Sequence, residues 1–282
     1  MKIIKRKRGK QQYYYLKHDF RRNGKVVTRE KYIGAVIPND IDSIKREFRK
    51  EIQPDLYSRL EAVKRTFQKD WGKLPASIRE QQKEELAITF TYNTNAIEGS
   101  TISEAEVRGI ILDKISPSKS LRDIKETEAH NVAFLEMLEQ QKPISNSLLL
   151  KWYKQIFNQT KPELAGKYRD YNVRVGSHIA PKHQEVKKLM NQLIRFIEKE
   201  KGNINPVELA AVAHYRFEKI HPFGDGNGRI GRLLMNHILW LAGYPILITE
   251  YKNRNTYYRA LDRDEDGFTS YLFRKYLAVH KN

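Results

Sequence analysis

The chain of 282 residues contains no cysteine. Disulfide bonds and thiolate metal sites are therefore excluded, and a reducing compartment is the simplest expectation. Long apolar runs are missing as well. The longest, roughly Leu233–Thr249, is too short to span a bilayer comfortably and is interrupted by Asn236, His237, Gly243 and Pro245. The first ten residues are basic and polar, which argues against a secretory signal. We therefore expect a cytoplasmic protein without a membrane partner.

Acidic residues are scarce relative to basic ones. There are 34 Asp and Glu against 52 Lys and Arg, so the formal net charge is +18. The excess is uneven, because residues 1–50 hold 16 Lys or Arg against 5 Asp or Glu. Such a field favours polyanions: nucleic acid, an acidic protein face or a membrane surface. The alternative explanation is that the positive charge serves solubility alone.

Strand-forming residues are concentrated in Gln11–Ile37, where tyrosines are mixed with lysines and arginines. Asn23-Gly24 lies between the two runs and is the strongest short signal for a β-hairpin turn. We expect a small basic hairpin or sheet over residues 1–40. Aromatic residues interleaved with basic ones suit nucleic acid. Docking onto the rest of the chain, or onto a protein target, is the alternative.

From Asp42 onward the chain is predicted to be helical, with Pro54 splitting or kinking a first long helix. Ser103-Glu104-Ala105-Glu106 is typical of a capping box. The expected later helices are about Ser77–Ile97, Ser103–Leu112, Ser120–Glu139, Ser145–Phe157, Gln184–Lys199, Pro206–Lys219, Arg229–Ala242, Arg254–Arg263 and Phe268–Val279. We expect a mainly α fold, with one helical region over residues 41–115 and a second over residues 116–282.

The stretch from His221 to Arg232, HPFGDGNGRIGR, indicates a phosphate-binding connection between two helices. Three glycines let its backbone turn sharply and approach a ligand closely: Gly224, Gly226 and Gly228. The amides that open the second helix form an anion site at the positive end of its dipole. Arg229 and Arg232 are three residues apart, so both can reach one anion. Asp225 offers a hard oxygen ligand for Mg²⁺, and His221 can accept a proton near neutral pH.

These twelve residues match the Fic motif, His-x-Phe-x-Asp/Glu-Gly-Asn-Gly-Arg-x-x-Arg, at every defined position. The chain therefore resembles the Fic family of protein adenylyltransferases, in the class II-like form. The resemblance implies a helical core with a short β-hairpin flap. It also implies transfer of AMP from Mg²⁺-bound ATP to a Ser, Thr or Tyr hydroxyl of a protein target, or of the chain itself.

The resemblance also implies a role for each residue of the motif. His221 is the general base for the attacking hydroxyl, and Asp225 holds Mg²⁺. The positions that bind the phosphates of ATP are Gly226, Asn227, Gly228, Arg229 and Arg232.

The likeness extends over about Ile78–Leu277. Within it, Tyr168–Ile179 resembles the family's target-binding flap, with Val173, Arg174, Val175 and Gly176. Tyr257 and Tyr258 resemble residues on the adenine side of the site. Without the family match, a surface hairpin and two core tyrosines would explain these stretches equally well.

A second stretch, Thr94-Asn95-Ala96-Ile97-Glu98-Gly99, resembles the family's inhibitory motif, Ser/Thr-x-x-x-Glu-Gly/Asn. The resemblance implies that Glu98 pairs with Arg232 and withdraws it from the γ-phosphate of ATP. The alternative is an ordinary acid in the last turn of a helix, with Gly99 as its cap. Two other functions stay open: removal of AMP from a target on the same fold, and a nucleic-acid-binding protein with a vestigial Fic core. A homodimer also stays open, since members of the family often dimerise.

Overall fold

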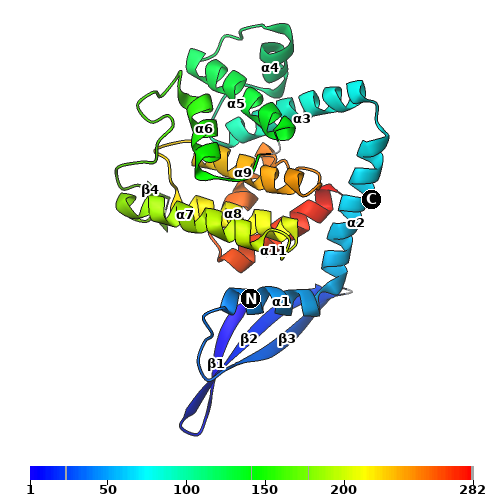
Figure 1. The fold of residues 1–282 in the computed structure, drawn as a ribbon, viewed down its shortest axis with the longest axis vertical. Helices are drawn as coiled ribbons and strands as arrows, with labels where there is room; N and C mark the ends of the chain where they lie inside the picture. Colours follow the sequence, from blue (N-terminus) through cyan, green and yellow to red (C-terminus); the bar gives the residue numbers. More distant parts are fainter. Residues whose placement is uncertain (23, 141, 177, 281–282) are drawn as a thin grey trace. The chain divides into compact units, whose positions relative to one another are not determined.

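The computed structural model describes residues 1–22, 24–140, 142–176 and 178–280. It is mainly helical (Figure 1), and it divides into two compact units, Met1–Ala62 and Val63–Asn282. The domain boundaries expected after residues 40 and 115 stay predictions. Among the described residues, no helix combines the length and the apolar character that crossing a membrane requires.

The first unit is built on an antiparallel sheet in the order β1 (Lys2–Arg8), β2 (Gln11–Arg22) and β3 (Lys25–Gly34). Helix α1 (Ile41–Ile52) packs on one face of this sheet. Phe48 of α1 is buried, and the Nζ atom of Lys31 on β3 lies 5.7 Å from its ring centroid. Lys31 pairs with the buried Leu16, so Leu16 marks the face that α1 covers.

The expected hairpin is confirmed as β2 and β3, although Asn23 of the expected turn lies outside the described residues. Strand β1 was not predicted. Its sequence, Lys2–Arg8, is dominated by lysine and arginine, which have little intrinsic preference for strands. Its strand conformation depends on pairing with β2, in which Ile4 lies opposite Tyr15.

The second unit contains the remaining helices and one small hairpin. Helix α2 (Pro54–Lys73) begins in the first unit, and Pro54 separates it from α1, as expected. The other elements are α3 (Ala76–Ile97), α4 (Glu104–Arg108), a π-helical turn (Gly109–Asp113), α5 (Leu121–Glu139), α6 (Asn146–Phe157), β4 (Arg174–Val175), β5 (His178–Ile179), α7 (His183–Glu200), α8 (Pro206–Ile220), α9 (Asn227–Leu241), a 3-10 turn (Tyr251–Asn253), α10 (Arg254–Leu261) and α11 (Glu265–Val279).

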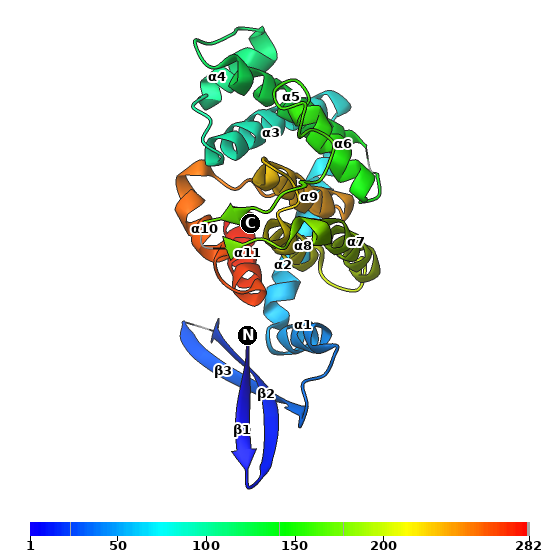
Figure 2. The same ribbon diagram turned by 90° about the vertical axis from the view of Figure 1, so that its left-hand side faces the viewer.

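Helices α8 and α9 lie at the centre of this unit in both views (Figures 1 and 2). Helices α7 and α11 pack against α8, while α3, α5 and α6 pack against α9. Almost every residue of α9 from Asn227 to Leu239 is buried, although the helix carries two arginines in its first turns. The two halves of the expected site therefore meet here, because α3 brings the segment ending at Glu98 against α9.

Two local predictions are confirmed in detail. Ser103 and Glu106 form the expected capping box, with the Ser103 amide donating to Glu106 Oε2 (2.7 Å). The expected flap is the hairpin of β4 and β5, in which Arg174 pairs with Ile179 and Val175 with His178. Ser177, between the two strands, lies outside the described residues.

Candidate functional site

The connection between α8 and α9 is held in shape by its own side chains. His221 ends α8 with φ +50°, in the left-handed region that side chains other than glycine rarely adopt. Phe223 is fully buried and stacks on Tyr153, with 3.9 Å between ring centroids. The Asn227 side chain accepts from the Phe223 amide (2.8 Å) and donates to the Phe223 carbonyl (2.9 Å). Because both ends of its side-chain amide are engaged in this way, the Asn227 side chain shapes the loop.

The start of α9 leaves backbone amides without a partner inside the helix, at the position where an anion site is expected. The first helical bond at this end runs from the Ile230 amide to the Gly226 carbonyl (3.2 Å). The amides of Asn227, Gly228 and Arg229 precede it, so they have no partner within the helix and lie at the positive end of its dipole. Gly226 has φ +70°, and a Cβ atom there would lie 2.2 Å from Cζ of Phe157. Only glycine fits this position.

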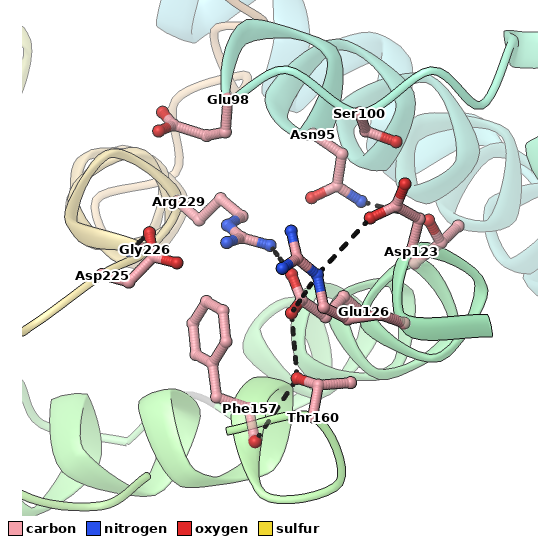
Figure 3. Close-up of polar contacts among 12 residues, drawn as sticks. Asn95, Glu98, Ser100, Asp123, Glu126, Phe157, Thr160, Asp225, Gly226 and Arg229 are labelled. Carbon is pink, nitrogen blue, oxygen red and sulfur yellow. Dashed lines mark hydrogen bonds and ion pairs between the residues drawn. The ribbon is translucent and has the colours of Figure 1, made fainter. Parts of the chain in front are cut away.

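The Arg229 side chain points toward Glu126 of α5 and lies beside Phe157 of α6, as Figure 3 shows. Its Nη1 donates to Glu126 Oε2 (2.5 Å), and its guanidinium lies 4.4 Å from the Phe157 ring centroid. Glu126 also accepts from Thr160 Oγ1 (2.9 Å) and lies 3.4 Å from Lys161 Nζ. Burial alone would raise the pKa of Glu126, but Arg229 and Lys161 outweigh it and hold the pKa below its usual value. This carboxylate therefore orients Arg229.

Asp225 is the oxygen ligand that the sequence offers to Mg²⁺. Its side chain is 45% exposed, accepts from the Gly226 amide (2.5 Å) and pairs with the ammonium group of Lys161. Burial raises the pKa of Asp225, but Lys161 and Arg229 together lower it by more than burial raises it. The carboxylate is therefore ionised at neutral pH. No group of three or more His, Cys, Asp or Glu side chains suited to a metal occurs in the described ranges. One half-exposed carboxylate nevertheless suits Mg²⁺, which usually keeps several waters and binds mainly through substrate phosphates.

Arg232 is bound to the end of α3, where the stretch that resembles an inhibitory motif lies. Its guanidinium donates to Thr94 Oγ1 (2.6 Å), to the Thr94 carbonyl (3.1 Å) and to Glu98 Oε1 (2.7 Å). Arg232 is only 1% exposed, whereas the Glu98 side chain is 28% exposed. Burial disfavours the charged form of Arg232, but the contact with Glu98 raises its pKa and keeps it charged.

The carboxylate of Glu98 also covers the expected anion site. A Cβ atom built on Gly228 would lie 2.2 Å from Glu98 Oε1 and 3.0 Å from Nη1 of Arg232. The space that glycine leaves free at the first turn of α9 is therefore filled by an anionic side chain. Gly99, with φ +94°, ends the segment just after Glu98.

His221 is partly buried beside these groups. Burial lowers the pKa of its imidazole to about 4, and the positive charge of Arg169 acts in the same direction. The imidazole is therefore neutral at pH 7 and able to accept a proton.

Arg169 connects the His221 loop to the flap. Its guanidinium donates to the carbonyls of His221 (2.7 Å), Tyr171 (2.8 Å) and Pro181 (2.7 Å). Strand β5 is anchored in the same region, where the His178 ring bonds the Lys219 carbonyl (3.0 Å), two residues before His221. The exposed edge of the flap is thereby held close to the expected base.

The expected flap and adenine-side residues differ in their surroundings. Val173 is partly buried, whereas Arg174, Val175 and Gly176 are exposed. Tyr258 is 42% exposed, and its hydroxyl donates to the Ile97 carbonyl (3.0 Å), next to Glu98. Tyr257 is buried, and its hydroxyl bonds the His214 ring (2.7 Å). The surroundings of Tyr257 are those of a core residue, so of the two tyrosines Tyr258 is the one whose ring a ligand can reach.

Several residues of the site were missed from the sequence. Glu126 lies in the middle of a helix, and Lys161 lies in an ordinary loop after α6. No motif distinguishes either of them from the other charged residues of this chain. Phe157 was predicted as the last residue of a helix, but not as part of the site. Arg169 was noted as part of the flap, without its contacts to the His221 loop.

Comparisons with known proteins point to one family. Residues 143–239 match the Fic/DOC family. The chain is 33% identical to Protein adenylyltransferase Fic of Nematostella vectensis over 189 residues, 65% of this chain and 44% of that protein. It is also 33% identical to the Drosophila melanogaster protein of the same name, over 66% of this chain and 39% of that one. This chain thus spans less than half the length of these curated relatives.

Solved structures give the same result. A Fic domain-containing signalling protein from Bacteroides thetaiotaomicron superposes with a TM-score of 0.67 at 27% identity, over 81% of this chain and 95% of that one. Fic-1 from C. elegans superposes with a TM-score of 0.70 at 25% identity, over 86% of this chain and 76% of that one.

Proposed function

Because residues 143–239 match the Fic/DOC family, we propose that this chain transfers AMP from ATP to a hydroxyl group of a protein. The hydroxyl oxygen forms a bond to the α-phosphorus. The bond from that phosphorus to the oxygen bridging to the β-phosphate breaks, and pyrophosphate leaves. The curated relatives named Protein adenylyltransferase Fic support this reaction.

The proton of the attacking hydroxyl passes to the imidazole of His221. This role is supported by the lowered pKa of His221, which keeps the ring neutral at pH 7. It is also supported by the clamp that Arg169 forms on the His221 carbonyl, because catalysis by a base requires a fixed geometry. A positioned base typically accelerates such a step by about 10²–10⁴-fold.

The phosphates of ATP bind at the start of α9 in this proposal. The amides of Asn227 and Gly228 receive the α-phosphate, while Arg229 and Arg232 bind the outer phosphates. Glu126 holds Arg229 in position through a buried ion pair. Asp225 would hold Mg²⁺, whose charge neutralises the polyphosphate. Lys161 must then leave the Asp225 carboxylate or share it.

The single observation that carries the inhibitory part of the proposal is the contact between Glu98 and Arg232 (2.7 Å). Glu98 places a carboxylate where a phosphate oxygen would bind, above Gly228 and against Arg232. Two anions cannot share this position without strong repulsion. We therefore propose that the resting protein is autoinhibited, and that ATP binds productively only after Glu98 moves away.

The target is proposed to be a Ser, Thr or Tyr side chain on an extended segment. Strands β4 and β5 form a two-stranded hairpin, and a peptide can add to its open edge by backbone pairing. The anchor of β5 at Lys219 supports this orientation, because it brings the edge near His221.

The test determines which phosphate of ATP is transferred to the protein. The Glu98→Gly variant is incubated with ATP labelled at either the α- or the γ-phosphate, and protein-bound label is measured. We expect label from the α-phosphate alone, on a Ser, Thr or Tyr identified by mass spectrometry, and about 10²–10⁴-fold slower labelling with Glu98→Gly/His221→Ala. Incorporation from the γ-phosphate would refute AMP transfer in favour of phosphorylation. Label that does not depend on His221 would refute the assigned base.

A further inference from the structure

The first unit begins with a strand in which five of the seven residues are basic. Strand β1 and the turn after it contain six basic side chains, all of them exposed: Lys2, Lys5, Arg6, Lys7, Arg8 and Lys10. We call this set the basic strand. The first acidic residue of the chain is Asp19. Arg6 forms a salt bridge with Glu30 (2.7 Å), and within the residues that the structure describes none is recorded for the other five.

The basic strand lies at an edge of the sheet, because β1 pairs only with β2 in the order β1-β2-β3. Its side chains alternate between the two faces. Arg6 lies opposite Tyr13, on the face turned away from α1, while Lys5 lies opposite Tyr14. Lysine on an edge strand ordinarily prevents pairing with other sheets. One or two such residues serve that purpose, so six basic residues among the first ten call for a further explanation.

Tyrosines cover the face of the sheet opposite α1. Tyr15 lies opposite both Ile4 and Tyr32, and the ring centroids of Tyr15 and Tyr32 are 5.3 Å apart. The ring centroid of Tyr13 lies 6.1 Å from that of Tyr32, and the guanidinium of Arg6 lies 5.0 Å from the Tyr15 centroid. Because these rings pack on one another at a tilt, part of their surface is already in contact and they do not form a flat platform for stacking bases. Their hydroxyl groups and the neighbouring cations suit phosphate groups better.

From this arrangement we propose that the basic strand is a binding site for the phosphate backbone of double-stranded nucleic acid. The run from Lys2 to Arg8 extends over about 20 Å at a strand rise of ~3.3 Å per residue. A DNA duplex presents one phosphate charge per about 3.4 Å along each strand, or about six over the same length. Five of the six cations lie within this run, so together they can neutralise most of the charge that one strand of a duplex presents over that length.

A membrane surface fits this site less well. Binding to a lipid surface combines cations with an apolar face of Trp, Phe or Leu that enters the bilayer. Strand β1 contains no Trp, Phe or Leu, and its one exposed apolar side chain is Ile3. The proposed binding is separate from AMP transfer, since it uses no residue of the second unit.

The experiment measures binding of the full chain to a fluorescent DNA duplex of about 20 base pairs, by anisotropy, over a series of salt concentrations. The test variant is Lys5→Gln/Lys7→Gln/Arg8→Gln. The matched control, Lys187→Gln/Lys188→Gln/Lys199→Gln, removes the same charge from exposed positions of α7. All six positions are exposed, so both proteins should fold, which circular dichroism checks.

We expect the wild type and the control to bind alike, with the logarithm of affinity falling linearly as the logarithm of salt concentration rises. The test variant should lose at least about 10-fold in affinity near 0.1 M salt. Its salt slope should be smaller by up to ~2.7, about 0.9 for each lost phosphate contact. The matching single strand should bind more weakly than the duplex.

Three outcomes would overturn the proposal. The first is equal affinities and salt slopes for the test and control variants. The second is tighter binding to the single strand than to the duplex, which would indicate stacking on the tyrosines. The third is binding to vesicles rich in anionic lipid without binding to the duplex, which would assign the strand to a membrane surface.

Discussion

Replacing Glu98 by glycine should release the proposed enzyme from its resting state. The substitution removes the carboxylate that bonds Arg232 at 2.7 Å and covers Gly228. Arg232 itself should stay in place, because Thr94 still accepts from its guanidinium at 2.6 and 3.1 Å. The vacated position then lies at the positive end of α9, ready for a phosphate group.

The size of the effect follows from the contact that is lost. A hydrogen bond between charged groups is worth about 1.5–3 kcal/mol. At 1.36 kcal/mol for each factor of ten, this corresponds to about 10- to 150-fold. ATP must displace Glu98 before it binds productively in the wild type. We therefore expect Glu98→Gly to bind ATP at least about 10-fold more tightly and to gain at least that factor in self-labelling.

The assay is the initial rate of self-labelling with ATP labelled at the α-phosphate, together with ATP affinity by calorimetry. Glu98→Gln keeps the volume of the side chain but removes its charge, so its rate should fall between the wild type and Glu98→Gly. Glu84→Gln, an exposed position on the same helix, is the matched control and should behave as the wild type. If a folded Glu98→Gly protein bound ATP no more tightly and labelled no faster than the wild type, the inhibitory role of Glu98 would be refuted.

Four further predictions concern the base and the residues that position the site. His221→Ala in the Glu98→Gly background should lower the transfer rate by about 10²–10⁴-fold, with ATP affinity unchanged by calorimetry. Burial lowers the pKa of His221 to about 4, and a base acts only when unprotonated. The log kcat/KM of Glu98→Gly should therefore stay constant from neutral pH down to about pH 5. A loss of activity as the pH falls through the ordinary histidine pKa of ~6.5 would contradict this. Arg169→Ala removes the donor from the His221, Tyr171 and Pro181 carbonyls, so urea denaturation should give a free energy of unfolding lower by about 3 kcal/mol, against no change for the exposed Arg195→Ala. Glu126→Gln removes the charge that holds Arg229, and we expect about 3 kcal/mol less stability and weaker ATP binding; unchanged values of both would mean that Arg229 is positioned without it.

The helices could be predicted from the sequence because their signals are local. Pro54 opens α2, and Ser103 and Glu106 form the box that begins α4, as the residue types require. Strand β1 was missed for the opposite reason. Lysine and arginine carry no local preference for a strand, and only the pairing of β1 with β2 makes it one.

The Arg232 contact shows what a family resemblance adds to local reasoning. Thr94 and Glu98 lie more than 130 residues before Arg232 in the chain, so no helical or strand period relates them. The resemblance supplied the pairing, and the packing of α3 on α9 brings the groups to hydrogen-bond distance. The role of the Asn227 side chain was not foreseen. A motif states which residue is present, but not which of its atoms is already engaged.

By itself, the sequence of this protein determined the features that depend on neighbouring residues: the helices, the hairpin turns, and a glycine-rich loop with a histidine at one end and two arginines at the other. Tertiary structure alone decided that Arg229 lies against Glu126, that Lys161 pairs with Asp225, and that Arg169 joins the flap to the His221 loop. These contacts join charges far apart in the chain. Which of its 86 Lys, Arg, Asp and Glu side chains meet is set by how the helices pack, and no local pattern records it.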